Sequence, residues 1–265
     1  MKRMKCFAAA SVTAIALAGC GGSENEPSTE SSAAPDSAAA ISGKITVFAA
    51  ASLKESFTTL EKDFEKSNPD ADIVFSFGPS SGLATQITQG APADVFASAA
   101  PKNMEQVTSG GDAKGPKTFA TNQMAIVTPP DNPGKITSLS DLAKADVKTA
   151  ICQPQVPCGG VAAEVFKKSK VRVKPATEEV DVKAVLTKVQ LGEVDAGMVY
   201  VTDSKAARSK VKTIDLTKSQ NASTQYPIVQ LTKAPNAAGA KAFIDLVLSD
   251  KGQQVLAKAG FSAPS

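Results

Sequence analysis

The sequence contains no histidine and no tryptophan, and only two tyrosines and four cysteines among its 265 residues. Histidine is the commonest general base and the commonest metal ligand in proteins. Its absence makes hydrolytic chemistry and zinc binding poor starting hypotheses. With 42% hydrophobic and 21% charged residues, the chain has an ordinary globular composition and is long enough for one large domain or two modest lobes.

Without its first 19 residues, the sequence also has no excess of basic over acidic residues. The chain carries 29 basic and 26 acidic residues, but Lys2, Arg3 and Lys5 precede residue 20, whereas no acidic residue does. The remainder is therefore formally neutral. Because nucleic-acid-binding domains normally carry a basic excess, we expect no nucleic-acid partner.

The N-terminus has the features of an export signal at residues 1–19. Basic residues precede an apolar run of 13 residues, too short to span a bilayer as a helix. The run leads into Leu17-Ala18-Gly19-Cys20, which resembles a bacterial lipobox. This predicts cleavage before Cys20, a lipid on its sulfur, and a location on the outer face of the cell membrane or in the periplasmic space. An ordinary signal peptide with a chance cysteine is the alternative.

After Cys20, residues 21–42 consist mainly of Ser, Ala, Glu, Pro and Gly, with almost nothing to bury. This composition predicts a flexible linker between the lipidated cysteine and the globular part.

Two further cysteines, Cys152 and Cys158, lie six positions apart. In an exported protein, an even pair this close most simply forms a disulfide. A metal site is less favoured, since two sulfurs with no histidine are a poor ligand set. A catalytic cysteine is weaker still, because no histidine is present to activate it.

From residue 44 onward, apolar runs of strand type alternate with apolar spacings of helix type. This alternation predicts an α/β fold with mixed, mostly parallel sheets. We expect strands at residues 44–50, 71–77, 94–97, 124–128, 147–152, 196–201 and 228–231, and helices at residues 53–64, 83–90, 161–169, 182–191 and 240–258.

Small and polar residues stand where four segments lead into helices. The first N–H groups of a helix have no intrahelical partner and carry the positive end of the helix dipole. In open α/β sheets these helix starts face the binding crevice, so the pattern predicts an anion site. The four starts are Ser52, Ser80-Ser81-Gly82, Val156-Pro157-Cys158-Gly159-Gly160 and Asp181-Val182.

Each of these positions also has a purely structural explanation. Ser52 and Glu55 have the spacing of a capping box, and Ser80 or Ser81 could be a plain helix cap. The remaining alternatives are a simple turn at Gly159-Gly160, a cap at Asp181 that leaves Val182 without a ligand role, and a core tyrosine at Tyr200 whose hydroxyl is satisfied by protein.

Several segments together resemble the molybdate-binding proteins of bacterial ABC importers, in order over about residues 44–262. The resemblance implies a two-lobed periplasmic-binding-protein fold with a two-strand hinge. It also implies a monomer without enzymatic activity or cofactor that binds molybdate or tungstate and docks on an ABC-transporter permease. The segments are Ile45-Thr46-Val47-Phe48-Ala49-Ala50-Ala51-Ser52-Leu53, Gly90-Ala91-Pro92-Ala93-Asp94-Val95-Phe96, Val156-Pro157-Cys158-Gly159, Ala196-Gly197-Met198-Val199-Tyr200, Tyr226-Pro227 and Gly260-Phe261.

The resemblance also implies five ligand residues. Better-known members have Ala where this chain has Cys158, which leaves a backbone contact intact and suggests that the Cys152–Cys158 bond braces the ligand loop. Pro79 stands where a Ser is often seen, so Ser80 and Ser81 both remain candidates. The implied ligand groups are the hydroxyl and backbone N–H of Ser52 and Ser80, the backbone N–H of Cys158 and Val182, and the hydroxyl of Tyr200.

These five positions include no Lys or Arg and offer only hydrogen-bond donors. Fixed dipoles at helix starts stabilise a dianion in a dry cleft. A donor-only pocket favours a fully deprotonated tetrahedral oxyanion over phosphate, which carries a proton near neutral pH and requires an acceptor. Discrimination between molybdate or tungstate and sulfate then rests on cavity size.

We expect one lobe at residues 43–121 plus 226–265 and the other at residues 122–225, with crossings near residues 119–122 and just before Tyr226. Closure about this hinge would sequester the anion. The alternatives are a binding protein for sulfate or another oxyanion, an exported enzyme on the same fold, and an adhesin or structural lipoprotein. An enzyme would need a converging acid and base, whereas Asp94 and Asp181 look structural.

Overall fold

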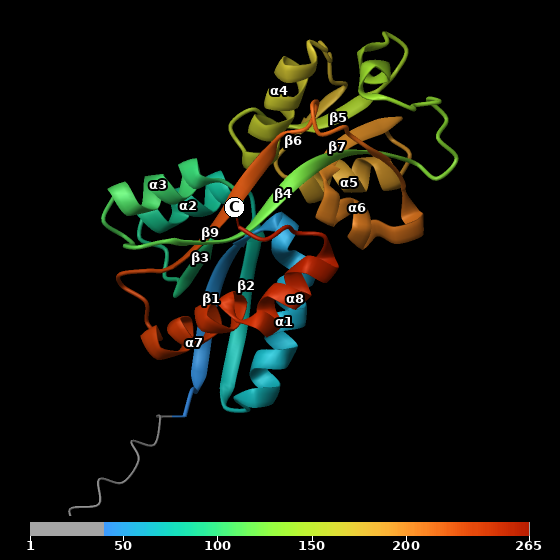
Figure 1. Cartoon of the computed structure of the whole chain (residues 1–265). Helices are drawn as coiled ribbons and strands as arrows, with labels where there is room; N and C mark the ends of the chain where they lie inside the picture. Colours follow the sequence, from blue (N-terminus) through green and yellow to red (C-terminus); the bar gives the residue numbers. More distant parts are fainter. Residues whose placement is uncertain (1–39, 265) are drawn as a thin grey trace, which may run out of the picture. The chain divides into compact units, whose positions relative to one another are not determined.

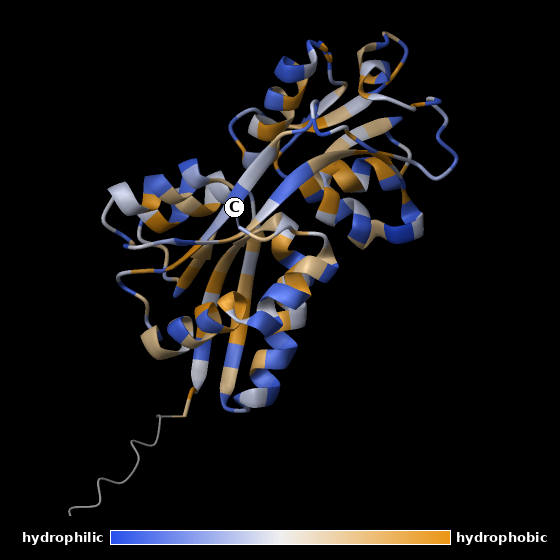
Figure 2. Ribbon diagram, in the orientation of Figure 1, coloured by the Kyte–Doolittle hydropathy of each residue, from blue (hydrophilic) through white to orange (hydrophobic). Residues whose placement is uncertain are grey.

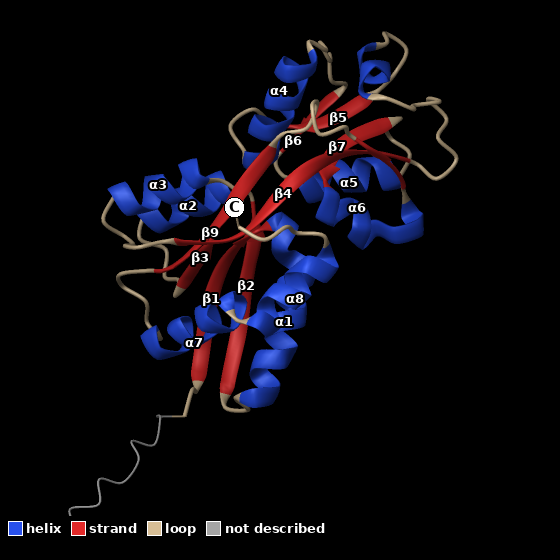
Figure 3. Ribbon diagram, in the orientation of Figure 1, coloured by secondary structure: helices blue, strands red, loops and turns tan. Residues whose placement is uncertain are grey.

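The computed structural model describes residues 40–264, which form a mixed α/β structure (Figures 1 and 3). The expected signal peptide, Cys20 and nearly all of the linker lie outside the described residues. No described helix is long and apolar enough to cross a membrane. The strands are β1 (Gly43–Ala50), β2 (Ala71–Gly78), β3 (Val95–Ala97), β4 (Lys117–Thr128), β5 (Thr149–Cys152), β6 (Thr177–Glu179), β7 (Ala196–Tyr200), β8 (Lys212–Asp215) and β9 (Ser223–Gln230).

Helices pack beside the strands β1 to β3 and also beside the strands β5 to β7 (Figure 1). Sequence periodicity did not predict α3, α6, β6 or β8, which are short and lack a long apolar stripe. The helices are α1 (Lys54–Ser67), α2 (Ser80–Thr88), α3 (Pro101–Ser109), α4 (Pro157–Ser169), α5 (Val182–Gln190), α6 (Val201–Ala207), α7 (Ala237–Leu248) and α8 (Asp250–Ala259), with 3-10 turns η1 (Ala51–Leu53), η2 (Leu139–Ala143) and η3 (Arg208–Lys210).

The strands join in the order β2-β1-β3-β9-β4-β7-β5-β6, with β8 paired to β4. β1 is parallel to β2 and β3, and β5 is parallel to β6 and β7. The four remaining pairings all involve β4 or β9 and are antiparallel. In residues 40–264 the sheet is thus mixed, but antiparallel pairings equal the parallel ones, because the two long central strands run against their neighbours.

β4 changes partners along its length. Its residues 117–123 pair with β9, whereas residues 124–128 pair with β7 and β8. The sequence predicted mainly the apolar parts of β4 and β9, because their other halves contain runs of polar residues, Thr121-Asn122-Gln123 and Ser223-Thr224-Gln225. The register shifts between Thr118 and Ala120, opposite Pro227, which has no N–H to contribute to the ladder.

Separate hydrophobic cores lie on either side of the point where β4 changes its pairing partners. One core consists of residues between 124 and 222. The other two consist of residues from 45–120 and 226–261. Figure 2 shows the hydrophobic residues gathered on the strands and on the helix faces turned toward them. The chain therefore passes between two packed regions along β4 and β9, as a two-lobed fold requires.

The helix expected at residues 240–258 is in fact two helices. α7 ends at Leu248, and Ser249 has extended backbone (φ −69°, ψ 162°) before α8 begins. Ser249 Oγ accepts a hydrogen bond from the Gly252 N–H at 3.2 Å and so caps α8. A serine followed by Asp250 is a helix-start signature, which the continuous apolar spacing concealed.

Candidate functional site

The 3-10 turn η1, which leads into α1, and the starts of α2, α4 and α5 converge on one small cavity of about 20 Å³. Its lining contains no Lys or Arg. A volume of this size admits a ligand of only a few atoms. The lining includes all five predicted ligand residues, Ser52, Ser80, Cys158, Val182 and Tyr200.

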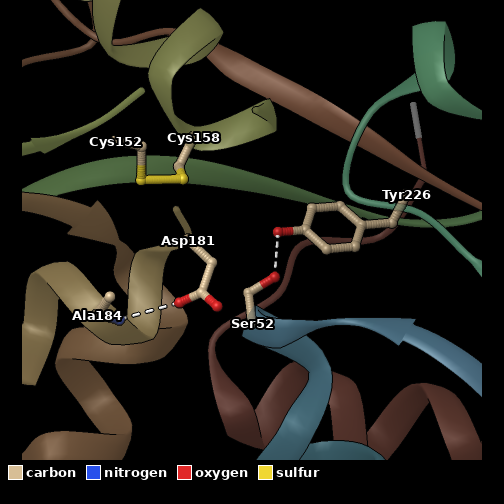
Figure 4. The surroundings of a disulfide bond; sticks show 6 residues. All are labelled: Ser52, Cys152, Cys158, Asp181, Ala184 and Tyr226. Atoms are coloured by element: carbon tan, nitrogen blue, oxygen red, sulfur yellow. Dashed lines mark hydrogen bonds between the residues drawn. A yellow bond between two sulfur atoms is a disulfide. The ribbon is translucent and has the colours of Figure 1, made fainter. Parts of the chain in front are cut away.

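Ser52 follows β1 within the 3-10 turn η1 and is buried. Its Oγ lies 2.8 Å from the hydroxyl of Tyr226 in β9, as Figure 4 shows. Neither η1 nor α1 has a side-chain cap, so the capping-box alternative with Glu55 is wrong. Ser52 lies in the 3-10 turn before the helix proper, and its Oγ contacts Tyr226 instead of an α1 amide.

Ser80 is the first residue of α2, and Pro79 is the cap residue, without a side-chain cap bond. The Ser80 Oγ accepts a hydrogen bond from the Ala99 N–H at 3.0 Å, so Ser80 is not a plain helix cap. Ser81 does not line the cavity. Of the two neighbouring serines, only Ser80 therefore lines the cavity.

α4 begins at Pro157 directly beside the disulfide between Cys152 and Cys158, whose Cα atoms are 5.7 Å apart (Figure 4). The bond ties the end of β5 to the first turn of α4. Gly159 is not a simple turn residue, since it is helical and packs against the backbone of Gln153. The loop that carries Cys158 is thus held by a covalent bond and by close backbone packing.

Asp181 caps α5 through a hydrogen bond from the Ala184 N–H to its carboxylate at 2.9 Å (Figure 4). The structural explanation for Asp181 is therefore correct. It does not remove the predicted role of Val182, because the cap bonds the third helical N–H. The N–H of Val182, at the first helical position, has no intrahelical acceptor.

Tyr200 ends β7 and is buried at the cavity. Its hydroxyl has no hydrogen-bond partner within residues 40–264, so it is not a core tyrosine satisfied by protein. Burial raises the pKa of Tyr200 well above its ordinary value. The phenol therefore stays protonated at physiological pH and can donate a hydrogen bond to an anion.

Sequence reasoning missed two buried residues behind the cavity, Tyr226 in β9 and Asn122 in β4. Asn122 Nδ2 donates to the Tyr226 hydroxyl at 3.4 Å and to Thr202 Oγ1 at 2.9 Å. Tyr226 belongs to one of the segments that carried the resemblance, but no local pattern singles out Asn122. Both residues lie on the strands that connect the two packed regions.

An ion-paired cluster lies beside the site. Lys183, in the first turn of α5, lies 2.7 Å from Glu55 of α1 and 2.9 Å from Asp203 of α6. Burial alone would lower the pKa of Lys183, but Asp203 and Glu55 outweigh it and the pKa is raised. Burial raises the pKa of Asp203 to about 6, with Lys183 opposing the shift. The Glu55–Lys183 pair joins α1, which directly follows the turn that carries Ser52, to α5, which begins at Val182.

Asp203→Asn is expected to remove a component of the pH dependence of stability. A carboxyl whose pKa is raised from 3.8 in the unfolded chain to about 6 in the folded one stabilises the fold at low pH. That stabilisation is lost as the pH rises from about 4 to 6, and the shift corresponds to roughly 3 kcal/mol at most. The wild type should therefore lose stability relative to the Asn variant across this range in urea unfolding at fixed pH steps. Parallel curves for the two proteins would contradict the assignment.

The chain resembles known proteins along nearly its whole described length. Residues 45–262 match the family model of the bacterial extracellular solute-binding protein. "Molybdate-binding protein ModA" of Mycobacterium tuberculosis is 38% identical over 257 residues, 96% of each chain. The protein of the same name from Haemophilus influenzae is 33% identical and covers 84% of this chain and 92% of its own. The "putative ABC transporter substrate-binding lipoprotein YvgL" of Bacillus subtilis is 33% identical over 269 residues, 99% of each chain.

Solved structures give the same fold. The periplasmic molybdate-binding protein of Azotobacter vinelandii superposes with a TM-score of 0.74 at 22% identity, covering 83% of this chain and 100% of that one. The substrate-binding domain of a putative molybdenum ABC transporter from Clostridium difficile gives 0.63 at 28% identity, covering 84% and 99%. With the family match over residues 45–262, the chain belongs to the family of bacterial extracellular solute-binding proteins.

Proposed function

We propose that this protein captures molybdate outside the cytoplasm and delivers it to an ABC importer, without transforming it. The observation that carries the proposal is the meeting of four helix starts and three hydroxyls on a small cavity with no basic residue in its lining. Helix-start amides and buried hydroxyls hold an anion without a counter-charge. The relatives named molybdate-binding proteins, at 38% and 33% identity, support molybdate as the anion.

The donors are the hydroxyls of Ser52, Ser80 and Tyr200 and the backbone N–H groups of Cys158 and Val182. Such a set suits a fully deprotonated tetrahedral dianion, so tungstate is expected to bind as well and phosphate poorly. Sulfate has the same charge and is smaller, so it should bind more weakly because it leaves the donors too far from its oxygens.

Titration of the purified protein with molybdate, tungstate, sulfate and phosphate tests the proposal. At 100 times its dissociation constant, a ligand that binds only the folded state adds about 2.7 kcal/mol of stability. A clear rise in melting temperature is expected with molybdate and tungstate, and a much smaller one with phosphate at the same concentration. A rise with sulfate alone would favour a sulfate-binding protein, and no rise with any of the four would overturn the proposal.

We further propose that residues 43–121 with 226–265 form one lobe and residues 122–225 the other. The separate hydrophobic cores and the partner change within β4 support this division. Ser52 and Ser80 would then meet Cys158, Val182 and Tyr200 across the cleft. Small-angle scattering should record a more compact particle when molybdate is added, whereas identical profiles would argue against hinge closure.

The expected attachment through Cys20 concerns residues that the structure does not describe. Membrane anchoring of a monomer by a lipidated Cys20 would hold the binding protein near its permease. Cys20→Ala is expected to release the protein from the membrane fraction of producing cells while the soluble part still binds molybdate. Unchanged partitioning of the variant would rule the anchor out.

A further inference from the structure

Behind the cavity lies a chain of buried polar side chains on the two connecting strands. Asn122 of β4 contacts the hydroxyl of Tyr226 in β9, and Tyr226 in turn contacts Ser52. All three residues are at most 4% exposed. Water therefore does not compete for these hydrogen bonds, and each group must find its partner within the protein.

Asn122 determines which groups donate and which accept at its end of this series of hydrogen bonds. Its Oδ1 accepts a hydrogen bond from the Gln123 N–H at 3.0 Å, which fixes which end of the amide is oxygen. The amide nitrogen then faces Thr202 Oγ1 at 2.9 Å and the Tyr226 hydroxyl at 3.4 Å. A primary amide nitrogen has two N–H donors and accepts nothing. The Tyr226 oxygen is therefore an acceptor on the Asn122 side.

The 2.8 Å contact between the Tyr226 hydroxyl and Ser52 Oγ is compatible with either group as donor. A Tyr226 hydroxyl that accepts from Asn122 still has its own proton to donate, and Ser52 Oγ lies within reach as its acceptor. When Tyr226 donates, the Ser52 proton is left for another acceptor, and Ser52 lines the cavity, where an anion would supply one. Ser80 is constrained in the same way, since the Ala99 N–H, which can only donate, bonds its Oγ at 3.0 Å. Both serines can thus give their proton to an anion in the cavity.

We propose that Asn122 and Tyr226 are positioning residues that hold Ser52 as a hydrogen-bond donor and thereby bias the site against protonated oxyanions. The inference rests on the proposed function, an oxyanion bound at this cavity. The Ser80 hydroxyl accepts its hydrogen bond from a backbone N–H, which no side-chain substitution removes. Ser52 depends on two side chains, so its direction can be tested.

The central variant is Tyr226→Phe. It removes the hydroxyl but keeps the ring that packs on Phe119 and Phe261, with centroids 6.2 and 5.1 Å away. The Ser52 hydroxyl then becomes free to rotate and to accept a proton from a ligand. We expect molybdate to bind up to about 10-fold more weakly, because Ser52 is no longer held as a donor and its hydroxyl must be ordered when the anion binds.

A double-mutant cycle with Ser52→Ala separates positioning from simple structural damage. If Tyr226 acts through Ser52, Tyr226→Phe should change molybdate affinity by less than about twofold when Ser52 is already Ala. Thr202→Val is the matched control, because it breaks the other bond of the Asn122 amide and leaves the Tyr226 and Ser52 contacts in place. It should alter affinity much less than Tyr226→Phe.

Selectivity gives the second readout. Sulfate and phosphate have nearly the same size, but only phosphate carries a proton near pH 6 to 7. Their relative strengths as competitors of molybdate therefore report on donor direction, independently of cavity size. In Tyr226→Phe, phosphate should become a stronger competitor of molybdate relative to sulfate. When Ser52 is already Ala, adding Tyr226→Phe should leave the relative strengths of the two competitors unchanged.

Equal losses of molybdate affinity in both Ser52 backgrounds, with an unchanged sulfate-to-phosphate ratio, would overturn the inference and leave the proposed function standing. A wild-type protein that binds none of these anions would instead overturn the proposed function. Circular dichroism and the melting temperature of each variant confirm that it is folded before affinities are compared.

Discussion

Tyr200→Phe is expected to weaken molybdate binding by roughly 10- to 100-fold while leaving the ligand-free protein at least as stable as the wild type. The Tyr200 hydroxyl is buried at the cavity without a partner among the described residues. A buried hydrogen bond to a charged group contributes about 1.5–3 kcal/mol, and the variant loses it. Without the anion, removing an unsatisfied hydroxyl costs nothing and relieves a desolvation penalty.

The expected loss of molybdate affinity without a loss of stability makes this prediction specific. Isothermal titration with molybdate gives the affinity, and urea unfolding without ligand gives the stability. A variant that loses affinity and stability together would indicate that the hydroxyl supports the fold rather than the ligand. Full retention of affinity would mean that the ligand site is misplaced.

Ser80 and Ser81 supply a matched pair for the same measurement. Ser80 is buried and lines the cavity, whereas Ser81 is its partly exposed neighbour outside the lining. Ser80→Ala should therefore weaken binding about as much as Tyr200→Phe, and Ser81→Ala should leave it within about twofold, because no ligand contact is removed.

Gly159→Ala is expected to destabilise the protein by at least about 3 kcal/mol and to abolish tight anion binding. A Cβ at this position would lie 2.0 Å from the carbonyl oxygen and 2.6 Å from the carbonyl carbon of Gln153. Backbone atoms cannot swing aside as a flexible side chain does. Gln153 is further held by its N–H bond to the Glu179 carbonyl at 2.9 Å. The segment next to Cys158 must therefore move, and the cavity wall moves with it.

Gly160 provides the control for this prediction. A Cβ at Gly160 would meet nothing within 4 Å, and the residue lies inside α4. Alanine is a better helix former than glycine by about 1 kcal/mol, so Gly160→Ala should raise the stability slightly and leave binding intact. Similar unfolding midpoints for the two variants would show that Gly159 is not close-packed in solution.

Part of the cavity lining was predictable from local helix-start patterns, whereas the choice of five ligand residues, including Tyr200, came from the family resemblance. Ser52, Ser80 and Asp181 each follow an extended segment and precede an apolar helical stripe, and the structure brings their helix starts together. The choice between ligand and capping roles was not predictable. It depends on contacts such as Ser52 to Tyr226, 174 positions apart, and Ser80 to Ala99, 19 positions apart.

The parts of the fold that periodicity missed share a physical cause. The halves of β4 and β9 that connect the packed regions contain runs of polar residues, so they give no strand-type hydropathy signal. Asn122 reads as a surface residue by type, but it is 2% exposed. A buried amide is recognisable only when its partners Thr202 and Tyr226 are placed around it.

The position of β9 in the sheet constrains the order in which the parts of the protein can fold. β9 lies in the sheet between β3 and β4, although it begins only at Ser223. A chain that emerges N-terminus first therefore leaves β1 to β3 with an open sheet edge until most of its length has appeared. The region of residues 124–222, which packs on itself, can fold earlier. The packed region that contains Ser52 and Ser80 is thus completed last, by the strand that also carries Tyr226.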